Sequence, residues 1–342
     1  MLSVRNMIWI QRIVKLFATL VLAFVFFLML LYRNDISSEE IDQKYTTPES
    51  HYIEVNGQNV HVRIMGEGDP IFLVHGSFSS LHTWENWQKL LSPYFMTISM
   101  DLPGHGLTGP DELQRYSIQD YSHLVLTLAE NLGLEKFHVA GNSMGGAVAM
   151  QMASTRPDKI LSLNLIDASG APVTSIRKLE ETPEDEQYGM IFKLTSNPIF
   201  SKVLLKCTPK FLFAMNVKEV YFDETKITES QIERYYELML REGNRQATLD
   251  RIQLPKDYNF DFEVLKMPTL IMWGKEDHWI PVKQAYLIEK AISGSNVVIF
   301  DQAGHVPMEE IPTETVKAYL SFLGIEVRED YFSEPNYLTY VH

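Results

Sequence analysis

Short apolar runs alternate with helical patterns through most of this 342-residue chain, and this alternation limits the possible folds more than any other feature. The apolar runs cover residues 71–74, 96–100, 137–140, 160–166, 269–273 and 297–300. The helical patterns cover residues 84–91, 118–132, 144–154, 282–292 and 313–323. Strands that are apolar on both faces and separated by helices are typical of a parallel sheet covered on both sides. We therefore expect an α/β domain with a mostly parallel, doubly wound sheet.

Two further segments belong to this expected domain, which spans residues 51–325. Residues 52–55 and 59–65 flank Asn56-Gly57, a dipeptide that favours a type I′ hairpin. Between residues 166 and 269 the chain contains no convincing strand, but it does contain helical patterns at 188–194, 198–205 and 229–241. We expect a helical insertion at about 170–260 and a C-terminal tail at 326–342.

Composition excludes several classes of protein. The formal net charge of −14 makes the chain acidic, and an acidic surface is repelled by nucleic-acid phosphates. Cys207 is the single cysteine, so an intramolecular disulfide framework and a cysteine-based zinc or iron–sulfur site are ruled out. We expect no bound nucleic acid, cofactor or metal, and no obligate protein partner.

The N-terminal segment contains 17 residues without a charge, from Leu16 to Tyr32. A helix of this length just reaches across a bilayer core. Arg5, Arg12 and Lys15 precede the run and acidic residues follow it, which predicts a cytoplasmic N-terminus. A cleaved signal peptide is the alternative, but its apolar region is usually about 7–15 residues long. We expect a membrane anchor over residues 1–33, followed by an aperiodic polar linker at 34–50.

The expected strand at 137–140 leads directly into the hexapeptide GNSMGG at 141–146, which opens a helix. A sharp turn from strand to helix strains the backbone of Ser143 and leaves room only for small neighbours, here Gly141 and Gly145. The turn raises the Ser143 hydroxyl above the sheet and places the Met144 N–H at a helix N-terminus, where it can stabilise an oxyanion. Ser143 is therefore a candidate nucleophile. A glycine-rich turn that only packs helix against sheet is the alternative.

A serine nucleophile needs a base and an acid that orients the base. His305 and Asp277 each follow an expected parallel strand, at the sheet edge where Ser143 emerges. The order Ser, Asp, His is the one used by this architecture. Asp167 also follows a strand and is the alternative acid, and His278 is a weaker candidate base.

A second oxyanion donor is expected in the HGSF segment at 75–78, which follows an earlier strand. Gly76 allows a turn that aims the Ser77 N–H at a developing negative charge. The His75 ring is expected to brace this loop. The DLPGHG segment at 101–106 is expected to form a structured turn, with substrate contact by Asp101 or His105 as the alternative.

Taken together, HGSF, DLPGHG, GNSMGG, the WGKED loop and the GHVP loop resemble the α/β-hydrolase superfamily over about residues 52–325. They are most similar to its cap-bearing esterase and lipase-like branch. The resemblance implies that Ser143 is the nucleophile, His305 the general base and acid, and Asp277 the orienting acid. It also implies that Ser77 and Met144 supply the oxyanion hole and that the insertion is a cap. Related dehalogenases and epoxide hydrolases carry Asp where this chain has Ser143, and carbon–carbon bond hydrolases tend to a more glycine-rich oxyanion loop.

The predicted function is a membrane-anchored serine hydrolase that cleaves carboxylic esters through an acyl-enzyme. The aromatic and aliphatic side chains of the expected cap favour a small, lipophilic ester substrate. The hydrolase domain is expected outside the cytoplasm, in the periplasm if the organism is a Gram-negative bacterium. An amidase or lactonase with the same triad is one alternative. An inactive hydrolase fold that serves as a binding module is the other.

Overall fold

The computed structural model describes residues 4–172, 201, 205–255, 258 and 260–332. Within them, eight strands form one sheet in the order β1-β2-β4-β3-β5-β6-β7-β8. β1 (Ser50–Val55) and β2 (Gln58–Met65) are antiparallel to each other, and β2 is antiparallel to β4. All other neighbouring strands run parallel, so the predicted mostly parallel sheet is confirmed.

The parallel strands coincide with the apolar runs of the sequence. They are β3 (Asp69–Val74), β4 (Phe95–Met100), β5 (Phe137–Asn142), β6 (Ile160–Ile166), β7 (Thr269–Gly274) and β8 (Asn296–Phe300). β5 and β7 are buried along their whole length, as expected for strands covered on both faces. Their carboxyl ends meet at one edge of the sheet.

Helices cover the two faces of the sheet. One apolar cluster joins the sheet to α4 (Ile118–Asn131), α5 (Met144–Thr155) and α12 (Lys283–Ala291). A second cluster joins it to α3 (Glu85–Leu91) and α14 (Pro312–Phe322), which follows the short helix α13 (Pro307–Glu310). Phe72 and Val74 belong to the first cluster, whereas Ile71 and Leu73 belong to the second. Alternate residues of one strand thus fill two cores on opposite faces.

The hairpin between β1 and β2 has the predicted type I′ geometry. Asn56 and Gly57 both adopt positive φ angles, of 54° and 84°. Val55 pairs with Gln58 across the two-residue turn. Short 3₁₀ turns occur elsewhere, at Leu81–Trp84, Pro157–Lys159, Glu224–Lys226, Phe262–Val264 and Glu329–Tyr331.

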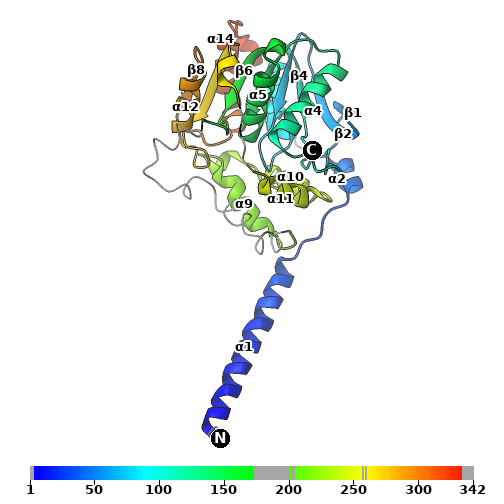
Figure 1. The fold of residues 1–342 in the computed structure, drawn as a ribbon, viewed down its shortest axis with the longest axis vertical. Coiled ribbons are helices and arrows are strands. Elements are labelled where there is room, and N and C mark those ends of the chain that lie inside the picture. The colour runs from blue at the N-terminus through cyan, green and yellow to red at the C-terminus, as the bar shows by residue number, and fades with distance from the viewer. Residues whose placement is uncertain (1–3, 173–200, 202–204, 256–257, 259, 333–342) are drawn as a thin grey trace.

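Three helices of the insertion are described: α9 (Lys210–Glu219), α10 (Glu229–Leu240) and α11 (Asn244–Gln253). They lie together at one end of the sheet, between the α/β body and helix α1 (Figure 1). α10 begins at a capping box, in which Thr228 and Gln231 bond to each other's backbone N–H. The helical patterns at 188–194 and at 198–205 lie outside the described residues, apart from Ser201 and Leu205.

Helix α1 (Val4–Leu31) projects away from the rest of the molecule (Figure 1). Its segment Trp9–Leu31 has 23 residues, the most apolar 18-residue window of that segment has a mean hydropathy of 2.7, and no residue of the window is buried. Length and composition allow this helix to cross a membrane. Both a membrane anchor and a signal sequence have these properties.

The segment between α1 and β1 differs from the aperiodic linker that we expected. It contains α2 (Ser38–Tyr45), and its backbone bonds to the cap. The Ile36 N–H donates to the Leu240 carbonyl at 2.8 Å, and the Glu242 N–H donates to the Ile36 carbonyl at 2.8 Å. The prediction was wrong here because long-range contacts hold this segment, and local periodicity carries no sign of them.

Candidate active site

Ser143 lies at the junction of β5 and α5 with a φ of 54° and a ψ of −118°. This conformation is rare for a residue with a side chain and costs about 1–3 kcal/mol. Crowding explains both flanking glycines. A Cβ on Gly141 would lie 2.1 Å from the Gly145 carbonyl oxygen, and one on Gly145 would lie 2.0 Å from that of Val74. The expected strained turn from strand to helix is confirmed.

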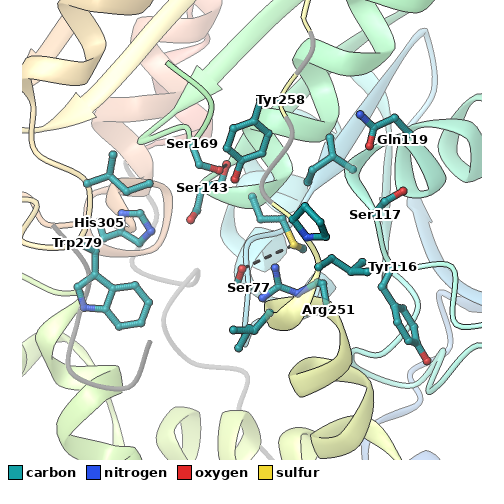
Figure 2. Close-up of a pocket in the computed structure, with 16 residues that line it drawn as sticks. Ser77, Tyr116, Ser117, Gln119, Ser143, Ser169, Arg251, Tyr258, Trp279 and His305 are labelled. Atoms are coloured by element: carbon teal, nitrogen blue, oxygen red, sulfur yellow. Dashed lines mark hydrogen bonds between the residues drawn. The ribbon is translucent and has the colours of Figure 1, made fainter. Parts of the chain in front are cut away.

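Met144 is the first residue of α5, so its N–H precedes the hydrogen bonds within that helix. Ser77 comes from the loop after β3, and its hydroxyl donates to the Met144 sulfur at 3.6 Å. Both residues line the cavity that Ser143 and His305 face (Figure 2). The two candidate oxyanion donors are therefore brought together beside the candidate nucleophile.

His75 braces the loop that carries Ser77. Its Nδ1 donates to the Gly76 carbonyl at 2.7 Å, and its Nε2 accepts from the Leu102 N–H at 3.0 Å. This pair of bonds requires a neutral ring, since only a neutral imidazole has one donor and one acceptor. Complete burial lowers the pKa of His75 and so favours that neutral form. The predicted bracing role is confirmed.

His305 and Asp277 are buried and in direct contact. Nδ1 of His305 lies 2.7 Å from Oδ2 of Asp277. The other carboxylate oxygen accepts from the N–H groups of Trp279, at 2.7 Å, and Ile280, at 3.0 Å. These two bonds hold the carboxylate still, and the carboxylate in turn orients the imidazole. Nε2 of His305 is thereby left for a second partner.

Asp167, the alternative acid, lies beside this pair. Its Oδ1 accepts from the Gly274 N–H at 2.9 Å, and its carboxyl group also interacts with the side chain of Asp277. Burial, together with the charge of Asp277, raises the pKa of Asp167 well above its usual range. Asp277, and not Asp167, is the acid that bonds to His305.

The same three side chains are the one group in the described part of the chain with spacing suited to a metal ion. One ligand atom from each of Asp167, Asp277 and His305 lies within 4.8 Å of the others. However, His305 and Asp277 are bonded to each other at 2.7 Å. A metal ion would have to displace that hydrogen bond, so the donor set fits a proton-transfer pair better than a metal centre.

Asn142 supports the His305 loop, and we did not predict this role. Its side-chain amide donates to the carbonyls of His305, at 3.0 Å, and Ile166, at 3.1 Å. The His305 N–H donates to the Val220 carbonyl at 2.8 Å, which ties the same loop to the cap. The position of Asn142 immediately before Ser143 was the one signal in the sequence that could have identified it.

The cavity above Ser143 has a volume of about 400 Å³. Besides the candidate residues, the apolar side chains that line it include Ile118, Ile252, Leu254, Pro255 and Ile280. A second, smaller compartment of about 50 Å³ shares Ser77, Ser143 and His305 with it. Phe213 and Val217 of α9 line this smaller compartment. Ser143 thus lies where a large and a small compartment meet.

The remaining candidates lie elsewhere. His278 is exposed and does not line either compartment. Asp101 and His105 are buried and line neither of them. The Leu107 N–H donates to Asp101 at 2.8 Å, and the His105 and His75 rings lie 5.0 Å apart. The DLPGHG segment is therefore a structured turn, as predicted.

A second Ser–His–Asp arrangement exists away from the cavity. Nε2 of His61 lies 2.8 Å from the Ser50 hydroxyl, and its Nδ1 lies 2.7 Å from Asp101. Ser50 begins strand β1 and also accepts from the Thr47 N–H at 3.1 Å. Because Ser50 does not open a helix, it lacks the helix N-terminal donor that Ser143 has in Met144. This arrangement joins the start of β1 to the end of β4.

The fold and the site together are those of an α/β hydrolase. Residues 69–312 match the alpha/beta hydrolase fold family, and the chain belongs to that family. It is 28% identical to monoacylglycerol lipase ABHD6 of Mus musculus over 76% of each chain. It is 29% identical to Lipase 1 of Psychrobacter immobilis over 75% of this chain and 78% of that one.

One solved structure extends the likeness beyond the hydrolase domain. It is described as the crystal structure of a membrane phospholipase A, a novel bacterial virulence factor. The two structures align with a TM-score of 0.60 and 21% sequence identity, over 95% of this chain and 99% of the other. At this identity the likeness shows a shared fold. The chain is thus a hydrolase of the α/β fold with lipases and esterases among its relatives.

Proposed function

We propose that this protein is a membrane-anchored serine hydrolase that cleaves lipophilic carboxylic esters. Ser143 is the nucleophile, His305 the general base and acid, and Asp277 the orienting acid. The observation that carries this proposal is the convergence of the strained Ser143 turn and the bonded His305–Asp277 pair on one cavity. Nucleophile, base and orienting acid in this relation define the serine-hydrolase mechanism.

In the acylation step, Oγ of Ser143 attacks the ester carbonyl and its proton passes to Nε2 of His305. The carbonyl oxygen becomes an oxyanion, which accepts hydrogen bonds from the N–H groups of Ser77 and Met144. Collapse of this intermediate breaks the bond to the alcohol, which leaves with the proton from His305. The acyl group stays on Ser143.

In the deacylation step, a water molecule attacks the acyl-enzyme and gives one proton to His305. The second oxyanion uses the same two donors and then collapses. The carboxylic acid departs, and the proton returns to Ser143. Asp277 accepts three hydrogen bonds, which hold it in place to orient His305 and to stabilise the imidazolium that forms in both steps.

Two observations support a lipophilic ester. Apolar side chains line much of the larger compartment and suit a hydrocarbon group. The relatives include a monoacylglycerol lipase and Lipase 1, whose names describe hydrolysis of lipid esters. Ser143 also separates this chain from the related dehalogenases and epoxide hydrolases, which carry an aspartate nucleophile at this position.

The proposed anchor is helix α1, with residues 1–3 and the start of the helix in the cytoplasm. Basic residues precede the apolar segment and acidic residues follow it, as the positive-inside rule requires. The likeness to the membrane phospholipase covers 95% of this chain. The uncovered part is shorter than the 28 residues of α1, so the likeness includes part of that helix.

Hydrolysis of p-nitrophenyl esters from acetyl to palmitoyl by the full-length protein in a non-ionic detergent tests the proposal. Ser143→Ala should lower kcat/KM by at least about 10³-fold, because the oxyanion hole and binding alone leave little catalysis. Ser50→Ala is the matched control, since Ser50 also bonds to a histidine that contacts an aspartate. We expect it to keep wild-type turnover.

A fluorophosphonate probe gives a second readout that does not depend on the choice of ester. It should label the wild type and Ser50→Ala, but not Ser143→Ala. If the protein hydrolyses amides or lactones but not esters, the activity is that of an amidase or a lactonase with the same triad. A folded wild-type protein that neither turns over these substrates nor reacts with the probe would contradict the proposal and favour a binding module.

A further inference from the structure

Arg251 is a basic side chain in the larger compartment. It lies on α11, within the cap, and lines the cavity together with Ser143 and His305. Figure 2 shows its guanidinium reaching into the cavity from α11. The described residues that line this compartment include no aspartate and no glutamate. The positive charge of Arg251 therefore has no matching negative charge among the described lining residues.

The guanidinium also lacks partners within the described chain. Its Nε and Nη2 atoms are buried and make no hydrogen bond, and no described carboxylate forms an ion pair with it. The neighbouring Asp250 instead accepts from the Gln246 side chain at 2.6 Å. A buried, unpaired charge is costly, so native structures usually supply a partner. Burial lowers the pKa of Arg251, but an arginine keeps its proton at neutral pH.

Polar neighbours in the cavity are already engaged. The Tyr116 hydroxyl donates to the Asp111 carbonyl at 3.2 Å and accepts from the Asp111 N–H at 3.0 Å. The Ser117 hydroxyl donates to Asp120 at 2.6 Å. These groups help to form the wall of the cavity without neutralising Arg251. Among the described residues nothing neutralises Arg251, and a molecule that enters the cavity can supply the missing counter-charge.

We infer that this hydrolase selects esters that carry a second, anionic group, a phosphate or a carboxylate, and that Arg251 binds this group. The inference rests on the proposed function of Ser143. A guanidinium presents parallel N–H donors that match the oxygen pairs of both anions. The apolar side chains that line the same compartment contact the carbon chain of the substrate. The smaller compartment, lined by Phe213 and Val217, receives the uncharged end.

Two pairs of esters test the inference on the full-length protein in a non-ionic detergent. The carboxylate pair is 4-nitrophenyl hydrogen glutarate and neutral 4-nitrophenyl valerate. The phosphate pair is 1-acylglycerol 3-phosphate and the 1-acylglycerol with the same acyl chain. We expect kcat/KM of the wild type to be about 10- to 100-fold higher for the charged ester of at least one pair, as hydrogen bonds to a charged group allow. The pair that shows the preference identifies the anion.

Substitutions then assign the preference to Arg251. Arg251→Met should lower the ratio of kcat/KM for the charged ester to kcat/KM for the neutral ester at least about tenfold. Arg251→Lys should keep part of this preference because it keeps the positive charge. Arg156→Met is the control, since it removes an exposed positive charge that bonds to Asp158. It should leave the ratio unchanged. An unchanged ratio in Arg251→Met, or a wild type without any preference for charge, would overturn the inference.

A binding measurement separates this inference from the proposed function. Calorimetry on Ser143→Ala should show tighter binding of the charged ester than of the neutral one, and Ser143→Ala/Arg251→Met should lose that difference. Absence of turnover in the folded wild type would contradict the proposed function, and binding alone would then decide the inference. Equal binding of charged and neutral esters by Ser143→Ala would reject it.

Discussion

Oδ2 of Asp277 lies 2.7 Å from Nδ1 of His305, whereas Asp167, which directly follows the neighbouring strand β6, accepts a hydrogen bond from the backbone N–H of Gly274. Both acids are buried and follow adjacent parallel strands. The difference in their partners gives them different roles. Asp277 orients the imidazole, and Asp167 is a buried neighbour whose pKa is raised by burial and by the charge of Asp277.

Asp277→Asn should lower kcat/KM by about 10⁴-fold, because an amide at this position favours the wrong tautomer of the imidazole. Asp167→Asn is the matched control and should lower kcat/KM by less than about tenfold, since an amide oxygen can still accept from the Gly274 N–H. Steady-state kinetics on one ester measures both variants. Equal losses in the two variants would show that Asp167 shares the orienting role.

The raised pKa of Asp167 predicts a pH dependence of stability. Because the folded state binds this proton more tightly than the unfolded state does, the folded state holds more protons from about pH 4 up to the raised pKa. The free energy of unfolding should therefore fall through this range as the pH rises. Asp167→Asn removes this contribution, so its melting temperature should fall less than that of the wild type between about pH 4 and pH 7. If the melting temperatures of the two proteins change equally over this pH range, Asp167 has an ordinary pKa.

The crowding at the Ser143 turn predicts a large cost for a single methyl group. Gly141→Ala should lower the free energy of unfolding by about 3 kcal/mol, because the new Cβ would lie 2.1 Å from a backbone carbonyl that has little freedom to move. Gly133→Ala is the control. Gly133 has a φ of 71° with no atom near its Cβ position, so only the conformational cost of about 1–2 kcal/mol applies. Urea denaturation compares the two, and a Gly141→Ala protein as stable as the wild type would contradict the turn geometry.

The connector before β1 should contribute to the stability of the cap. Asp35 bonds to the buried Arg245 of α11 at 2.5 Å. Asp35→Ala leaves that guanidinium without its counter-charge and should cost about 1–3 kcal/mol. Cleavage of the cap between residues 205 and 255 in limited proteolysis should become faster.

Asp301→Ala is the matched control for this prediction. Asp301 bonds to Lys275 at the same distance of 2.5 Å, but both side chains are more than half exposed. An exposed pair is worth about 0–1 kcal/mol, so the cleavage pattern should stay close to that of the wild type. Equal effects of the two substitutions would mean that the connector does not hold the cap.

The sequence by itself determined the mostly parallel sheet, the hairpin, the strained turn at Ser143 and the loops that carry Asp277 and His305. These features follow from short-range chemistry. Apolar runs between helices favour parallel strands, Asn-Gly favours positive φ angles, and crowding at a strand-to-helix turn demands glycine. The carboxyl ends of parallel strands share one edge, so even the approximate neighbourhood of the site was predictable.

Only the tertiary structure decided which acid bonds to His305. Asp167 and Asp277 both follow adjacent parallel strands, and they differ in the groups that distant parts of the chain bring next to them. It also decided that α2 packs on the cap, and that Arg251 lines the cavity with no counter-charge among the residues that the structure describes. The Ser50–His61–Asp101 arrangement likewise joins distant residues. Hydrogen bonds and burial at these positions depend on residues far apart in sequence, and no local pattern specifies them.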